Sequence, residues 1–274
     1  NVEEIYLSQK TEKIENVEIQ LAVEEPRESK PQISEIFNLR KRNSKVFKQN
    51  DGTEQAVFYS KPVHVFNEET KMFDEVDKKV IEDDEHKHLV NSKNGFVAKF
   101  SQEENNDELF SIENGMHRVT VFARKNQKNK NKGVKPVVST KFDIHNADVV
   151  NYSNIEASTD YEYSVESDGI KENIVIKEKM NAYRYPFILK CENVIAKLDE
   201  QSKRIAFFSK ETGEEVFYIP APFMMDAIGK TSDAVSYEMR CTDGDDIYLT
   251  VSADGGWLNE KMRAFPVVID PQIK

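Results

Sequence analysis

Arg204 to Asp226, RIAFFSKETGEEVFYIPAPFMMD, is the stretch that decides the fold. Two runs rich in aromatic and β-branched residues flank a Lys-Glu-Thr-Gly turn, in which Gly213 can adopt a positive φ. This arrangement predicts a β-hairpin. Pro220 and Pro222 then end the second strand, because proline has no N–H for further pairing. The side chains expected in the core are Phe207 or Phe208, with Phe217 or Ile219.

Short alternations of apolar and polar residues recur along the chain and end at turn signals such as Asn50-Asp-Gly52. A period of two is typical of strands that bury one face. In residues 170–176, the three isoleucines are expected to point one way, with Lys171, Glu172 and Asn173 between them. The pattern predicts a mainly β protein, with antiparallel sheets in two β-sandwich-like lobes.

Three segments are expected. Residues 1–32 are rich in Glu and Lys and form an acidic leader or linker. Residues 33–135 form an N-terminal β lobe and residues 136–274 a C-terminal β lobe, with the polar run 126–133 (NQKNKNKG) near the boundary. One continuous β domain is the alternative. At most a short N-terminal helix is expected, within 33–41, where the apolar spacing is closer to helical.

The composition excludes several classes of protein. The net charge is −11, which argues against a nucleic-acid partner or insertion into an anionic membrane, because phosphate binding needs clustered Lys and Arg. No run of about 18 apolar residues is present, so no membrane-spanning helix is expected. The 16 Phe and 10 Tyr residues are enough to build a core, and global disorder is therefore excluded.

The two cysteines, Cys191 and Cys241, both lie in expected strands. A cross-strand disulfide is one interpretation, and two buried thiols are the other, which is favoured. A small secreted scaffold would carry a denser, even set of cysteines.

Two groups of residues offer metal-ligand chemistry. His86 and His88 lie beside three acidic residues, although no second cluster completes a transition-metal site. Asp243, Asp245 and Asp246 offer hard oxygens of the kind that calcium prefers. The Asp-Gly step among them is also an expected hairpin turn, so no cofactor is predicted beyond this calcium hypothesis.

Tyr183, Tyr185 and Trp257 are the candidate glycan-binding residues, because exposed aromatic rings can stack on sugars. The same residues are more often part of core or hairpin packing, and that interpretation is favoured. No serine occupies a nucleophile-elbow pattern, neither cysteine lies in a catalytic-looking motif, and no glycine-rich phosphate loop occurs. We therefore expect no enzyme activity, with a hidden hydrolase kept as an alternative.

Three motifs carry a family resemblance: Arg184-Tyr-Pro-Phe187, Glu214-Glu-Val-Phe-Tyr-Ile-Pro-Ala-Pro222 and Phe265-Pro-Val-Val-Ile-Asp-Pro271. In these motifs the chain resembles the region upstream of DNRLRE-type modules in large secreted YD-repeat (RHS-like) wall-associated proteins of Gram-positive bacteria. Shorter matches begin near residue 36, so the resemblance covers roughly residues 36 to 271.

The resemblance implies an extracellular, cell-wall-associated β-rich module that precedes a repeat array. It brings no catalytic residues. The function expected is that of a non-enzymatic structural or interaction module, with other modules of the same polypeptide, wall or host glycans, or host proteins as partners. A carbohydrate-binding β-sandwich is the first alternative.

Overall fold

The structure is a computed structural model that describes residues 34–83, 87–102, 107–124, 137–140, 148–156, 158–241, 246–270 and 272–274. The predicted acidic leader at 1–32 and the polar run at 126–133 lie outside these residues. Within the described residues, no helix has the length and apolar character needed to cross a membrane.

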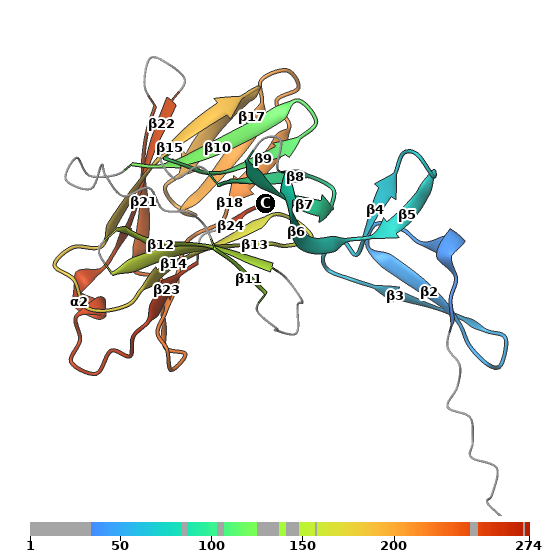
Figure 1. The fold of residues 1–274 in the computed structure, drawn as a ribbon, viewed down its shortest axis with the longest axis horizontal. Helices are drawn as coiled ribbons and strands as arrows, with labels where there is room; N and C mark the ends of the chain where they lie inside the picture. The colour runs from blue at the N-terminus through green and yellow to red at the C-terminus, as the bar shows by residue number, and fades with distance from the viewer. Residues whose placement is uncertain are drawn as a thin grey trace, which may run out of the picture.

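Among the described residues, two antiparallel sheets of eight strands each form a sandwich (Figure 1). The mainly β, antiparallel fold predicted from the sequence is thereby confirmed. Sheet 1 has the order β21 (Val235–Cys241), β22 (Asp246–Ala253), β15 (Arg184–Glu192), β10 (His117–Ala123), β9 (Glu108–Asn114), β8 (Val97–Ser101), β7 (His88–Lys93) and β6 (Asp77–Asp83).

Sheet 2 covers the inner face of sheet 1. Its order is β11 (Val137–Thr140), β12 (Asp148–Glu156), β13 (Thr159–Val165), β14 (Ile170–Ile176), β23 (Val267–Ile269), β19 (Met224–Met225) and β20 (Thr231–Ser232), and β24 (Gln272–Ile273) also pairs with β14. The last strand runs beside Gly169, where any Cβ would lie 2.1 Å from the carbonyl oxygen of Ile273, so this close approach requires glycine.

The core lies between the two sheets, because alternate residues of each strand face inward. In β13, Tyr161, Tyr163 and Val165 are buried. The Tyr163 ring packs 4.9 Å from that of Phe110 of sheet 1, between ring centroids. Tyr152 of sheet 2 places its hydroxyl 2.6 Å from the carbonyl oxygen of Leu109. Aromatic packing and this hydrogen bond therefore join the sheets.

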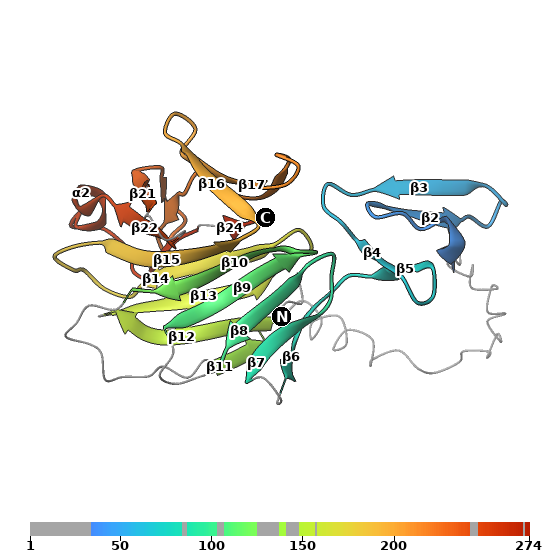
Figure 2. The ribbon, with the colours of Figure 1, turned by 90° about the horizontal axis from the view of Figure 1, so that it is seen from above.

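The predicted hairpin is confirmed as β17 (Arg204–Ser209) and β18 (Glu215–Ile219), with Gly213 at φ 71° in the turn. Together with β16 (Val194–Asp199) it forms a three-stranded sheet, which lies beside β15 and β10 of the sandwich (Figure 2). Phe207 and Phe217 are buried. The backbone of Tyr218 exchanges hydrogen bonds of 2.7 and 2.8 Å with Lys274, which joins the hairpin to the end of β24.

Residues 34–76 form a separate N-terminal unit that projects from one side of the sandwich (Figures 1 and 2). It consists of a three-stranded sheet, a two-stranded hairpin and one turn of 3-10 helix, η1. The strands are β1 (Ser34–Glu35), β2 (Ser44–Lys48), β3 (Glu54–Phe58), β4 (His64–Asn67) and β5 (Met72–Glu75), and η1 spans Phe37–Leu39. The only other described helix is α2 (Gly255–Leu258), which Asp254 caps through the N–H groups of Gly256 and Trp257.

The boundary expected between residues 135 and 136 does not separate two sheets. Strand β10, before that boundary, pairs with β15, after it, from Arg118 opposite Glu192 to Ala123 opposite Phe187. A visible separation lies instead between β5 and β6, where the N-terminal unit meets the sandwich. The physical reason is that the backbone N–H and C=O groups along an edge of β10 need hydrogen-bond partners. A strand distant in sequence, β15, supplies them.

Candidate functional site

Two of the three aromatic residues proposed for sugar stacking are in the core. Tyr183 is 3% exposed and Tyr185 is 1% exposed, so they lack the exposure that sugar stacking requires, as the favoured core-packing interpretation expects. The hydroxyl of Tyr183 donates to Asn259 Oδ1 over 2.9 Å and accepts from the Met180 N–H over 2.8 Å. The alternation of Tyr185 with Phe187 and Leu189 in β15 is the signal that indicates this inward orientation.

Trp257 is half-buried and carries an arginine on its ring. The guanidinium carbon of Arg263 lies 3.2 Å from the ring centroid, and Arg263 also pairs with Asp226 at 2.8 Å. Both ends of that ion pair are buried, at 2% and 0% side-chain exposure. One face of the Trp257 ring is therefore occupied, and the three aromatic residues do not form a common platform.

The metal hypotheses fall largely outside the described residues. Asp243 and Asp245 are not described, and Asp246 is half-buried at the start of β22, opposite Lys190 of β15. His86 is not described. His88 Nε2 lies 3.7 Å from Glu108 Oε1. Among the residues that can be assessed, no group of three or more His, Cys, Asp or Glu side chains could hold a metal ion.

Cys191 and Cys241 do not form a disulfide. They lie on β15 and β21, which are separated by β22, so two strand spacings of about 4.8 Å each keep their backbones beyond the roughly 7 Å that a disulfide can span. Cys191 is half-buried and Cys241 is exposed, so the expectation of two buried thiols is wrong for Cys241.

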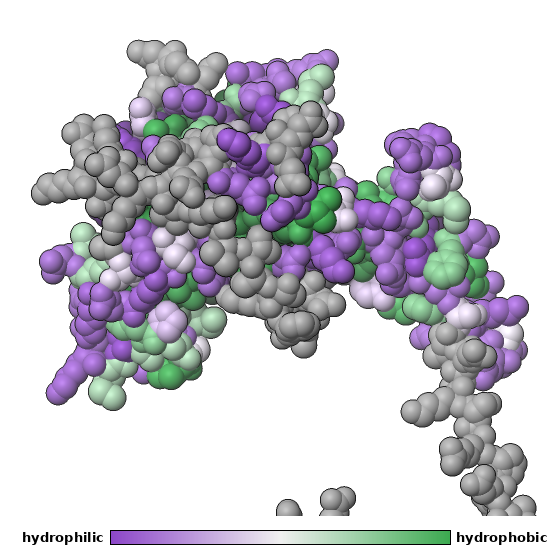
Figure 3. Space-filling view, in the orientation of Figure 1, coloured by the Kyte–Doolittle hydropathy of each residue, from purple (hydrophilic) through white to green (hydrophobic). Residues whose placement is uncertain are grey.

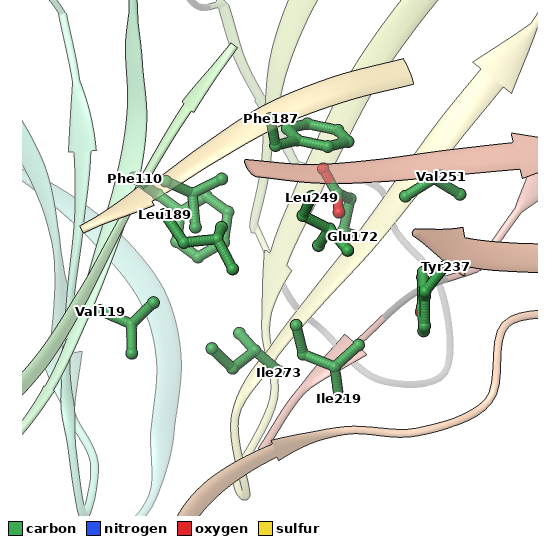
Figure 4. A pocket seen from close by; sticks show the side chains of 11 residues that line it. Phe110, Val119, Glu172, Phe187, Leu189, Ile219, Tyr237, Leu249, Val251 and Ile273 are labelled. Atoms are coloured by element: carbon green, nitrogen blue, oxygen red, sulfur yellow. The ribbon is translucent and has the colours of Figure 1, made fainter. Parts of the chain in front are cut away.

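An apolar cavity of about 30 Å³ lies inside the sandwich (Figure 4). Sheet 1 supplies most of its wall, Ile219 of β18 and Ile273 of β24 close it, and the carboxyl group of Glu172 points into it. Glu172 is on β14 and shares a face with Ile170 and Ile174. The other lining residues are Phe110, Val119, Val121, Phe187, Leu189, Tyr237, Leu249 and Val251.

Burial is the largest influence on Glu172 and raises its pKa to about 7. The Tyr163 hydroxyl donates to Glu172 Oε1 over 2.5 Å, which opposes this shift, and the negative charge of Asp270 adds to it. Sequence reasoning missed this residue, although the period of two in 170–176 already puts Glu172 on the isoleucine face. The structure thus places one titratable acid inside an apolar core.

The cavity is too small to be a substrate pocket. Ligand pockets enclose roughly 300–1,000 Å³, whereas this cavity has about 30 Å³, enough for water. Apart from Glu172, only Tyr237 brings a polar side-chain atom to its lining, and the Tyr237 hydroxyl donates to Pro220 O over 3.2 Å. Acid–base catalysis on a substrate would need room beside the carboxyl group, which this cavity does not offer.

The N-terminal unit has a polar interior. Of its residues 34–76, all of which are described, only Ser44 and His64 are buried. Arg40 donates to both carboxylate oxygens of Glu35, over 2.8 and 2.9 Å. The His64 ring lies 3.6 Å from the same carboxylate and donates from Nδ1 to Lys41 O over 2.8 Å. Arg40 holds the pKa of Glu35 below its usual range, chiefly by hydrogen bonding.

Comparison with known proteins gives distant relatives. The chain is 26% identical over 246 residues to the tRNA nuclease WapA of Bacillus subtilis (strain 168), a match that covers 86% of this chain and 10% of that protein. The tRNA3(Ser)-specific nuclease WapA of Bacillus spizizenii is 25% identical, with the same coverage. A wall-associated protein of Geobacillus stearothermophilus is 22% identical over 74% of this chain and 83% of its own length.

The chain thus spans about a tenth of the length of the WapA relatives, and it is similar over most of its own length to part of wall-associated proteins. No family model matches it.

Proposed function

We propose that this chain is a non-enzymatic structural and interaction module of a large, secreted, cell-wall-associated protein with YD-type repeats. Its N-terminal unit docks against another part of the same polypeptide. The observation that carries the proposal is that this unit has no buried apolar side chain.

The apolar residues of the N-terminal unit are on its surface. Phe58 is 80% exposed and Phe37 is 58% exposed, and hydrophobic residues are visible on the surface of the unit in Figure 3. The other large apolar residues exposed in the unit are Leu39, Tyr59, Phe66 and Met72. Exposed large apolar side chains in this number, on a unit without a buried apolar residue, favour an interaction surface.

A unit of this size gains little stability by itself. Residues 34–76 are 43 residues, close to the size of about 40 residues below which domains generally need disulfides, metals or association, because they bury too small a fraction of their surface. Its links to the sandwich include ion pairs from Lys61 to Asp168, at 3.1 Å, and from Lys61 to Glu166, at 3.7 Å. Lys61 is 43% exposed, and exposed pairs contribute only about 0–1 kcal/mol. Covering the apolar residues is therefore the larger source of stability open to the unit.

The same polypeptide is the partner that the relatives favour. The matched region is 10% of the WapA proteins, so in those relatives it is accompanied by a much longer chain. A docking partner in that chain is present at high effective concentration, because it is covalently attached.

The alternatives have less support. Sugar binding through Tyr183 and Tyr185 would require two buried rings to leave the core. Its direct test is a glycan array, on which binding that is lost in Trp257→Ala would favour it over the docking proposal. A hydrolase has no support from the interior cavity, whose small volume leaves no room for substrate.

Hydrogen exchange tests the docking. We expect the amides of β2 to β5 to exchange at least 10-fold more slowly in the full-length polypeptide than in this 274-residue chain, while the amides of β13 and β14 do not change. Phe58→Ser should abolish the added protection. The matched control is Ile195→Ser, in β16 and outside the N-terminal unit, where Ile195 is 50% exposed. Equal exchange of β2 to β5 in both chains would refute the docking.

A further inference from the structure

A shallow groove of about 290 Å³ lies on the outer face of sheet 1, away from the core and from the N-terminal unit. Strands β15, β21 and β22 and the residue that follows β10 form it. The pairing register places Arg124 beside Pro186, Pro186 opposite Thr250, and Thr250 opposite Glu238. The remaining lining residues are Arg184, Arg240 and Tyr248.

The groove is basic in an acidic protein. Three guanidinium groups face one carboxylate, whereas the whole chain has a net charge of −11. Glu238 accepts from Arg184 over 3.0 and 3.3 Å. Arg124 and Arg240 are both exposed. Among the described residues, the structure shows no ion pair between a carboxylate and either of these arginines. The site therefore keeps two positive charges for an external anion.

Guanidinium groups match the geometry of phosphate oxygens, and the two that no described carboxylate pairs with, those of Arg124 and Arg240, line the same groove. The basic surface also continues along the sheet. Lys190 lies on the same outer face of β15 as Arg184. The two residues are six positions apart, which is a distance of about 20 Å along the strand. The Lys190 ammonium group is 5.0 Å from the Phe122 ring centroid. A ligand with phosphates at intervals along a chain would meet positive charge at both positions.

We propose that this groove binds a phosphodiester group of an anionic polyol-phosphate polymer. That this polymer comes from the cell wall rests on the proposed function. RNA also carries phosphodiesters but fits the groove less well. Arg124 lies 5.0 Å from the centroid of the Tyr248 ring and occupies the face on which a base would stack.

Titration calorimetry of the 274-residue chain with synthetic poly(glycerol phosphate) tests the proposal. The double variant Arg124→Gln/Arg240→Gln should bind at least 10-fold more weakly, and the slope of log K against log salt concentration should fall by about 1–2. The control Arg204→Gln removes a half-buried arginine that lies 4.2 Å from the Tyr218 ring centroid and pairs with Glu215. It should bind like the wild type.

Glu238→Gln separates loss of binding from loss of folding, because it removes the carboxylate that competes for Arg184 and should tighten binding at least 3-fold. Equal affinity of the wild type and the double variant, or no gain in Glu238→Gln, would overturn the proposal. So would tighter binding of tRNA than of poly(glycerol phosphate), or binding only to vesicles of anionic phospholipid. These outcomes are independent of hydrogen exchange in β2 to β5, so the docking proposal can fail while this one holds.

Discussion

Replacing Glu172 by Gln should change how stability depends on pH. The free energy of unfolding of the variant, minus that of the wild type, should rise between pH 4 and pH 8. The folded-state pKa of Glu172 is raised from 4.5 to about 7, because its carboxyl group lies in an apolar cavity. A raised folded pKa means that the contribution of the neutral acid is fully present below the unfolded pKa. It is lost as the pH rises through the folded pKa.

The magnitude follows from the shift. Each pKa unit corresponds to about 1.4 kcal/mol, so ionisation of Glu172 lowers the free energy of unfolding by about 3 kcal/mol above pH 7. In the Glu172→Gln variant the side-chain carbonyl can still accept the hydrogen bond from Tyr163, but the new amide N–H groups lack that partner and add a penalty that does not vary with pH. The prediction therefore concerns the pH dependence of the difference, not its absolute value.

Urea denaturation at pH 4, 5, 6, 7 and 8 measures this difference. We expect the variant to gain about 3 kcal/mol on the wild type between pH 4.5 and pH 8, with most of the gain between the unfolded and the folded pKa. Glu200→Gln, in the exposed turn before β17, is the matched control and should show no such trend. A difference between Glu172→Gln and the wild type that stays constant across this range would refute the assignment of a buried, ionising carboxyl group.

The remaining predictions concern packing, the N-terminal unit and activity. Phe207→Ala should lower the free energy of unfolding by about 3–5 kcal/mol because its ring is fully buried, whereas Phe208→Ala, at a half-buried position, should cost clearly less. Equal losses in urea denaturation would contradict this. Arg263→Ala should uncover the single tryptophan, Trp257, and shift its fluorescence emission to longer wavelength; unchanged emission would contradict the stacked geometry. The lowered pKa of Glu35 means that its ion pair stabilises the folded unit above the unfolded pKa of about 4.5 and is lost as the pH falls through the folded value. NMR signals of β1 and β2 should therefore broaden or shift below pH 4.5 in the wild type and far less in Glu35→Gln. The purified chain should leave tRNA and peptidoglycan intact, and product release by either would refute the non-enzymatic proposal.

The local elements could be predicted from the sequence because their signals are local. The hairpin at Arg204–Ile219 follows from two β-forming runs around a glycine turn, and its strands pair as Ile205 opposite Ile219 and Phe207 opposite Phe217. The inward face of β13 follows in the same way from alternation. Such features depend on residues that are a few positions apart.

The candidate sites depended on information that no local pattern contains. The cavity around Glu172 is made by side chains from three sheets, and the arginine groove by residues of β15, β21, β22 and the end of β10. The exposure of Phe58 also requires knowing that nothing in the described chain packs on it. Tyr185 is the exception, because its alternation with Phe187 and Leu189 already indicates burial.

The sequence by itself determined that this protein is an antiparallel β protein, because strand propensity, the period of two and turn chemistry are properties of neighbouring residues. Only the tertiary structure decided which strands pair. Residues 117–123 lie in one sheet with residues 184–192, and this places Glu172 of the facing sheet over an apolar wall. The physical reason is that one β strand can pair with many others through the same backbone hydrogen bonds, and the choice among them is made by the packing of the whole core.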